Sequence, residues 1–163
     1  MPQSPKEQDR RAALGALADT HRVALPLNDV QAAWLDELVP FLATIPARMH
    51  GGLIRYVLAG VVPGDFLQAV LANDLLDSVG RADDENLPIL DRYVLLLKMA
   101  APAACFRSRE RVAAWAAHRG LASPEPTCTV PPPGWACSRS PGHDGPCSAE
   151  WTAGRTADAA VAG

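Results

Sequence analysis

The chain has 163 residues, with 15 Lys and Arg against 18 Asp and Glu and a formal net charge of −3. This length suits one domain with tails, and the missing basic excess argues against general binding to nucleic acid or to membrane surfaces. The polar N-terminus, and the lack of an apolar run of about 18 residues, lead us to expect a cytoplasmic protein with no signal peptide and no transmembrane helix.

The N-terminal residues 1–25 are charged and rich in alanine, and their apolar face is weak. We therefore expect a flexible N-terminal arm, followed by a helical domain over residues 26–122. The first firm helix should begin at Asn28, because asparagine is a favoured N-cap residue. Its expected core face carries apolar side chains at helical spacings: Val30, Trp34, Leu38 and Phe41.

The second and third predicted helices follow from similar signals. One spans about residues 48–59 and ends at Gly60, a suitable left-handed C-cap. The next opens at Asp65, which forms a capping-box variant with a glutamine three positions on, and ends at Gly80. The third helix should bury a stripe of four residues: Leu67, Leu71, Leu75 and Val79.

Two further helices complete the predicted domain. A fourth should be capped by Asp83 or Asp84 and end at Ala101, and a short fifth should follow Ser108 and run to Gly120. The expected buried face of the fourth contains Leu87, Leu90, Val94 and Leu97. No segment shows sustained strand alternation. The fold class predicted is all-α, a compact bundle of four to five short helices.

The C-terminal segment, residues 123–151, is rich in proline and glycine and contains most of the cysteines. Its four candidate metal ligands have the spacing C-x8-C-x5-H-x3-C: Cys128, Cys137, His143 and Cys147. Three thiolates and one imidazole are a common ligand set for structural zinc, so we expect one Zn here, with Cys128 the least secure ligand. A disulfide between Cys137 and Cys147, or free thiols in a disordered tail, are the alternatives. Residues 152–163 are expected to be disordered.

A polar patch is the other candidate site. If the second and third helices pack antiparallel, the start of one approaches the end of the other, and a binding site can form there. The residues that would contribute are Arg48, His50, Arg55, Tyr56, Asn73 and Asp74. The alternative is an ordinary surface ion pair, which contributes little to stability.

Catalytic signatures are missing from the sequence. It contains no glycine-rich phosphate loop, no nucleophile elbow and no HExxH zinc motif. Asp74 and Asp77 share a helix face and residues 83–85 are acidic, so a magnesium-dependent nuclease is an alternative, but first-turn positions of a helix explain residues 83–85 equally well. We therefore do not expect an enzyme.

Several stretches resemble short uncharacterised helical proteins of tailed phages and prophages. They are residues 45–57 (IPARMHGGLIRYV), 62–75 (VPGDFLQAVLANDL), 80–86 (GRADDEN), and a tail of the pattern GWxC…GHxGPC over residues 134–147. The resemblance implies a mobile-element origin and no particular activity. A location in the host cell cytoplasm would follow from it.

Two functional hypotheses follow. The favoured one is a phage or prophage accessory protein that binds a host or phage protein as an adaptor or as an inhibitor of a host system. The alternative is a nucleic-acid-associated regulator that uses the Cys/His segment as a small zinc module, since Gly142-His143 is similar to the Gly-His pair of retroviral zinc knuckles. We expect no membrane partner.

Overall fold

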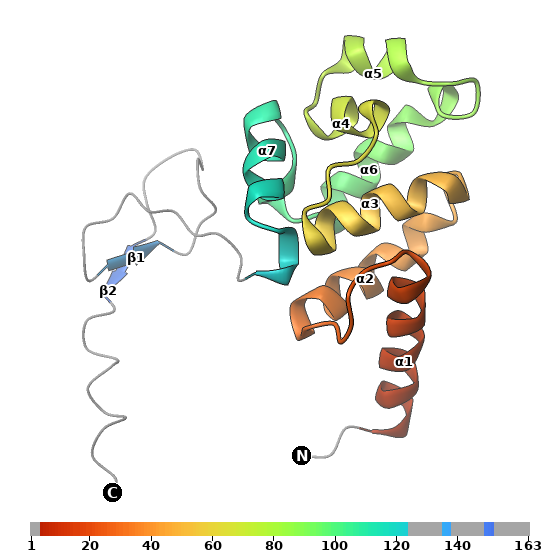
Figure 1. Cartoon of the computed structure of the whole chain (residues 1–163). Coiled ribbons are helices and arrows are strands. Elements are labelled where there is room, and N and C mark those ends of the chain that lie inside the picture. Colours follow the sequence, from red (N-terminus) through yellow and green to blue (C-terminus); the bar gives the residue numbers. More distant parts are fainter. Residues whose placement is uncertain (1–3, 124–134, 138–148, 152–163) are drawn as a thin grey trace, which may run out of the picture. The chain divides into compact units, whose positions relative to one another are not determined.

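The computed structural model of the chain describes residues 4–123, 135–137 and 149–151. The chain divides into two units, Met1–Pro124 and Glu125–Gly163 (Figure 1). Between residues 4 and 123 all regular structure is helical: α1 (Pro5–Thr20), α2 (Asp29–Leu42), α3 (Ala47–Ala59), α4 (Asp65–Leu71), α5 (Leu75–Arg81), η1 (Leu87–Ile89), α6 (Leu90–Ala100), η2 (Ala103–Cys105), α7 (Arg109–Ala117) and η3 (Gly120–Ala122). None of these helices is long and apolar enough to cross a membrane.

Three predicted helix ends are confirmed. Asn28 caps α2 in a full capping box with Gln31, and the Ser108 side chain caps α7. Gly60 ends α3 with a φ of 69°, the left-handed conformation that glycine adopts without strain. The expected start of α4 is wrong by one residue, because Gly64 occupies the N-cap position and Asp65 is already helical.

The N-terminal segment differs from the flexible arm that we expected, because Pro5–Thr20 forms α1. Ser4 caps this helix, and Leu14 and Ala18 are buried. Two ion pairs join α1 to α2: Arg10 with Asp36, and Arg11 with Asp29. The contact needs only a narrow apolar face, and such a face is too weak to stand out in a charged, alanine-rich sequence.

The predicted third helix is two helices, α4 and α5. Asn73, between them, has a φ of 59°, a left-handed conformation that asparagine adopts more readily than most residues. Asp74 then caps α5 by accepting a hydrogen bond from the Asp77 amide at 3.1 Å. Leu75 and Val79 therefore leave the predicted buried stripe, which continues only as far as α4.

The predicted fourth helix begins later than expected. Asp83 caps a turn, accepting 2.9 Å hydrogen bonds from the backbone and side-chain amides of Asn86, and η1 precedes α6. Leu97 is buried as predicted, but the rest of the buried face is rotated, with Tyr93 and Leu96 buried while Val94 is 60% and Leu87 45% exposed. Because α6 carries apolar side chains nearly all round, its periodicity did not define one face.

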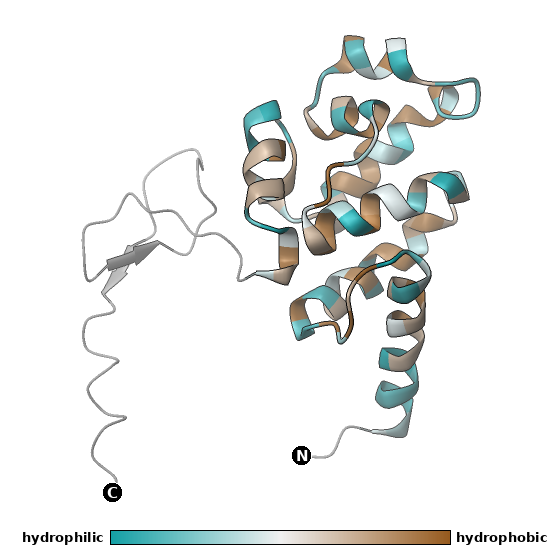
Figure 2. Cartoon of the chain, viewed as in Figure 1, coloured by the Kyte–Doolittle hydropathy of each residue, from teal (hydrophilic) through white to brown (hydrophobic). Residues whose placement is uncertain are grey.

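The core of the helical unit gathers side chains from α2, α3, α4, α6 and α7. The largest that are fully buried are Trp115, Tyr56, Tyr93, Leu35, Leu38 and Leu53. Val30, placed on the core face by its spacing, is instead 57% exposed, because the buried face of α2 passes through Gln31 and Trp34. Figure 2 shows hydrophobic residues along α3 and α6 and hydrophilic ones on the first turns of α1.

The end of α3 and η3 approach each other through two glycines. Gly60 and Gly120 both have positive φ, 69° and 59°. A Cβ atom on Gly120 would lie 2.5 Å from the Val57 carbonyl oxygen and 2.7 Å from the Gly60 nitrogen. Only glycine fits such a close backbone approach, which attaches residues 120–122 to α3.

The second unit contains a pair of antiparallel strands, β1 (Trp135–Cys137) and β2 (Ala149–Trp151). In their register Trp135 lies opposite Trp151, and Cys137 lies opposite Ala149. The sequence did not predict strands, because each is only three residues long, below the roughly four-residue run that a strand pattern needs.

Candidate functional site

Arg48, on the first turn of α3, contacts two carboxylates. Its guanidinium donates a hydrogen bond to Asp83 Oδ2 at 2.8 Å and another to Glu85. The pKa of Asp83 lies below its ordinary value, first because the Asn86 amide donates to the carboxylate and next because Arg48 does. All of these side chains but Asn86 are exposed, so the pairing contributes little to stability.

The other predicted binding residues of α3 lie in different surroundings. His50 Nε2 forms a 3.1 Å hydrogen bond with the Ile45 carbonyl, and Arg55 Nη1 donates to the His21 carbonyl at 3.4 Å. Tyr56 is fully buried, which gives it a structural position and no access to a ligand at the surface.

Asn73 and Asp74 lie at the junction of α4 and α5, where Asp74 pairs with Arg109 of α7 at 2.9 Å. No hydrogen bond or ion pair among the described residues joins Arg48 or His50 to Asn73 or Asp74. The structure therefore does not assemble the predicted polar patch. The physical reason is the helix break, which turns Asp74 toward α7 and leaves the residues after α5 to pair with Arg48.

The break instead exposes three apolar side chains, which we call the α5 surface: Leu75, Leu76 and Val79. Their exposed fractions are 70%, 87% and 44%. Among the residues of α5, only Ser78 is buried, so α5 rests on α4 without adding a side chain to the apolar core. Figure 1 shows α5 at the end of the helical unit opposite α1, and Figure 2 shows hydrophobic residues on it.

An ionic frame, defined by Asp65, Asp74, Asp77, Arg81 and Arg109, links α5 to α4 and α7. Arg109 donates to Asp74 at 2.9 Å and to Asp77 at 3.1 Å, while Arg81 donates to Asp77 at 2.7 Å and to Asp65 at 3.1 Å. Hydrogen bonds from Arg81 and then from Arg109 lower the pKa of Asp77. Each charged side chain of the frame therefore has a partner of opposite charge within it.

A shallow hollow of about 460 Å³ lies beside the α5 surface. Its lining comes from the α4–α5 junction and from the start of α7: Ala72, Asn73, Asp74, Leu75, Leu76, Ser108, Arg109 and Glu110. The two leucines are thus part of a concave, partly apolar region with a charged border. Sequence reasoning missed it, although Asn73-Asp74 carried the signal, since asparagine favours the left-handed conformation and aspartate favours N-caps.

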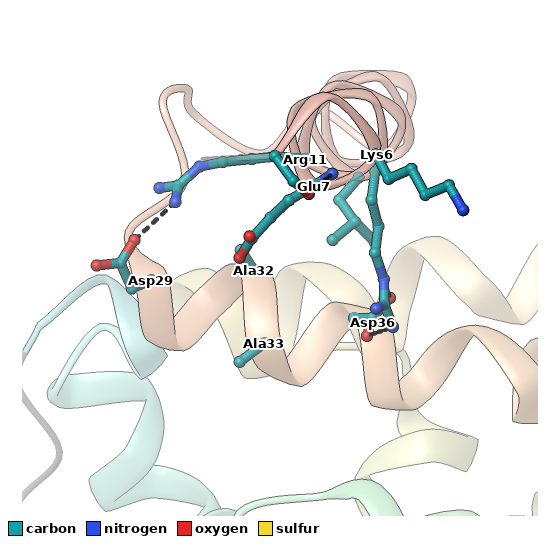
Figure 3. Close-up of a pocket in the computed structure, with 10 residues that line it drawn as sticks. Lys6, Glu7, Arg11, Asp29, Ala32, Ala33 and Asp36 are labelled. Atoms are coloured by element: carbon teal, nitrogen blue, oxygen red, sulfur yellow. Dashed lines mark hydrogen bonds and ion pairs between the residues drawn. The ribbon is translucent and has the colours of Figure 1, made fainter. Parts of the chain in front are cut away.

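A second hollow, of about 650 Å³, lies between α1 and α2. Figure 3 shows Arg11 of α1 reaching Asp29 of α2, while Ala32 and Ala33 lie between Asp29 and Asp36 along α2. Its arginines, Arg10 and Arg11, already have carboxylate partners. This hollow therefore offers a ligand few uncompensated charges.

The predicted zinc ligands are not tested. Cys128, His143 and Cys147 lie outside the described residues, and for Cys137 only the backbone, in β1, is described. Among the residues that the structure does describe, no group of three or more His, Cys, Asp or Glu side chains is arranged to hold a metal ion. Comparison with protein-family models, with curated proteins and with solved structures found no match to this chain.

Proposed function

We propose that this chain is a phage or prophage accessory protein that binds another protein through the α5 surface. The observation that carries the proposal is the exposure of two consecutive leucines, Leu75 and Leu76, on a helix whose apolar side chains do not enter the core. Fully burying one leucine is worth about 1.5–3 kcal/mol. Contact with a partner would bury these side chains, and the free energy of that burial would stabilise the complex.

Hydrogen bonds and ion pairs join the helix that carries the α5 surface to its neighbours, which favours a binding role. Asn73 and Asp74 fix the direction in which α5 leaves α4, and Arg109 ties both Asp74 and Asp77 to α7. A surface that is already ordered loses less conformational entropy on association than a loop does. The leucines are therefore presented to a partner as apolar surface that needs little further ordering.

The partner should offer an apolar pocket or helix face without a strong excess of either charge. The reason is that each charged side chain of the ionic frame already has a partner of opposite charge, so a partner protein gains little from a complementary electrostatic patch. Binding should then depend weakly on salt concentration, since the contact made by the uncharged leucines has no charge for salt to screen. A host or phage protein in the host cytoplasm fits this description, and the chain would act on it as an adaptor or inhibitor.

The test compares two matched substitutions. Leu76→Asp places a charge on the α5 surface, and Val30→Asp places the same charge on α2, where Val30 is 57% exposed. The full chain and both variants are used to capture proteins from host lysate. Each protein retained is then purified and titrated against the three chains by calorimetry, at low and at high salt.

The proposal requires a purified partner whose affinity drops at least about tenfold, or 1.4 kcal/mol, for Leu76→Asp and is unchanged for Val30→Asp. Equal affinity for all three chains would overturn it. Sedimentation equilibrium of the unmodified chain and of Leu76→Asp is a second test. A dimer that forms in the unmodified chain and is lost in Leu76→Asp would show that the α5 surface binds a second copy, contrary to the proposal.

The pairing of β1 with β2 favours a second candidate, a nucleic-acid-associated zinc module. In the strand register Cys137 lies opposite Ala149, and the sequence between these two residues contains His143 and Cys147. We propose that one zinc ion, which would supply much of the folding free energy of so small a segment, is held by Cys128, Cys137, His143 and Cys147.

Zinc per chain, measured in protein purified without chelators, tests this candidate. About one zinc is expected in the unmodified chain, with loss in Cys137→Ser and in His143→Ala. A stoichiometry well below one in the unmodified chain contradicts the site. The nucleic-acid role has its own test, a mobility shift with single-stranded DNA at low salt, where electrostatic binding is strongest. No shift there would reject that role.

A further inference from the structure

Three basic side chains from two helices gather on one side of α3, around Gly51. Added to Gly51, a Cβ atom would lie 2.9 Å from Arg55 Nη1 and 3.1 Å from His21 Nδ1. Arg55 Nη1 and His21 Nδ1 therefore both lie close to the helix backbone at Gly51. His50 is the residue before Gly51, and it interacts electrostatically with His21.

Arg55 lacks a carboxylate partner among the described residues. Its one hydrogen bond, to the His21 carbonyl, is long at 3.4 Å, although a guanidinium group has five N–H donors. Arg48, seven positions earlier on the same helix, has two carboxylates instead. Arg55 is half-buried, so its charge is partly removed from water, and an anion bound beside it would compensate that charge.

The two imidazoles add further polar ring nitrogens on the same side. His21 is half-buried at the C-terminal end of α1, and its electrostatic interactions are with two basic groups, His50 and Arg55. His50 uses Nε2 for the Ile45 carbonyl. No acidic residue is a partner of any of these three side chains among the described residues.

We propose that His21, His50 and Arg55 form a binding site for a small oxyanion of the phosphate class, either inorganic phosphate or a phosphate monoester. A tetrahedral oxyanion presents several acceptors at once, so one ligand can bridge the Arg55 guanidinium and the nearby His21 ring. Charge-assisted hydrogen bonds of this kind are among the strongest in proteins. Gly51 contributes because it lacks a Cβ atom, which lets the Arg55 and His21 nitrogens lie this close to the helix backbone.

NMR titration of the full chain tests the site. The side-chain resonances of His21 and His50 are followed near pH 6, close to the ordinary imidazole pKa of about 6.5, at constant ionic strength. Inorganic phosphate is added in one arm, phenyl phosphate in a second, and sodium chloride in a third. A saturable shift of both histidines is expected with one or both phosphates, and the comparison between them shows whether the free or the esterified group is preferred.

Variants then assign the ligand contacts. Arg55→Gln should weaken phosphate binding by roughly tenfold or more, the loss expected for a charge-assisted hydrogen bond. Arg48→Gln is the matched control and should leave the affinity unchanged, because Arg48 is already paired. Arg55→Lys keeps the charge and is the second variant if Arg55→Gln fails to fold. It should retain part of the affinity of the unmodified chain for phosphate. Linear shifts no larger than those with chloride, or equal losses for Arg48→Gln and Arg55→Gln, would overturn the proposal.

Discussion

The hydroxyl of Tyr56 donates a hydrogen bond to the carbonyl oxygen of Cys105 at 2.5 Å, and this bond joins α3 to the turn that precedes α7. The backbone carbonyl of Tyr56 in turn accepts a 3.2 Å hydrogen bond from Trp115 Nε1 of α7. Burial raises the pKa of the Tyr56 hydroxyl well above its ordinary value, so the group remains a donor. One residue thus connects three segments through a fully buried polar contact.

Tyr56→Phe should lower the free energy of unfolding by about 1–3 kcal/mol, because it removes the hydroxyl and leaves the Cys105 carbonyl without this buried donor. Urea denaturation followed by circular dichroism measures the change. A loss within the roughly 0.5 kcal/mol that is usual for surface substitutions would contradict the role of this bond.

Two buried tryptophans should respond differently to the same substitution. Trp34 Nε1 is buried and has no hydrogen-bond partner in the described part of the chain, whereas Trp115 Nε1 donates to Tyr56. Exchange for phenylalanine removes the same volume at each site, so the cavity costs are similar. Trp115→Phe should then destabilise the fold more than Trp34→Phe, by roughly 2 kcal/mol. Equal losses in parallel urea titrations would contradict the difference in hydrogen bonding.

Substitutions at Asn73 test the break between α4 and α5. Asn73→Ala should reduce stability by about 1 kcal/mol, because alanine is strained in the left-handed conformation, while Asn73→Gly should be close to neutral because glycine is not. Thermal unfolding of the two variants alongside the unmodified chain provides the comparison. If alanine were tolerated as well as glycine, a continuous helix through residues 65–81 would become the better description.

His21 should make stability depend on pH in the mildly acidic range. Burial, and then the neighbouring His50 and Arg55, lower its pKa below the ordinary value of about 6.5. The unfolded chain therefore binds a proton more tightly than the folded chain, and stability falls as the pH drops below about 6.5 toward the lower folded-state value. Urea midpoints measured from pH 7 downward should show this decline, and His21→Asn should flatten it. If stability instead increased as the pH fell over the same range, the prediction would be contradicted.

The parts of the fold that were predictable are those set by local chemistry. The N-caps Asn28 and Ser108 and the left-handed Gly60 act through their own backbone and near neighbours, so the sequence around them contains the whole signal. The break at Asn73 was missed because Leu67, Leu71, Leu75 and Val79 keep helical spacing across it. Periodicity reports spacing and does not report a change of direction.

The candidate sites were harder to predict because they depend on which charges meet. Arg48 and Asp74 were expected to face one another, but each has a nearer partner brought to it by tertiary packing, Asp83 for one and Arg109 for the other. The predicted binding residues included His50 and Arg55 without His21, since that histidine is the C-cap of α1, a helix that the sequence did not predict. The zinc ligands stay a prediction.

The contact between Gly60 and Gly120 sets a limit on how far the chain can be shortened from its C-terminal end. Residues 120–122 fill the space against the end of α3, and Gly120, Leu121 and the backbone of Val57 are buried together there. Asn28 adds to this attachment by donating a 2.8 Å hydrogen bond to the Leu121 carbonyl. We expect a chain that ends after Ser123 to keep the helical fold, while one that ends before Gly120 uncovers apolar surface on α3 and aggregates.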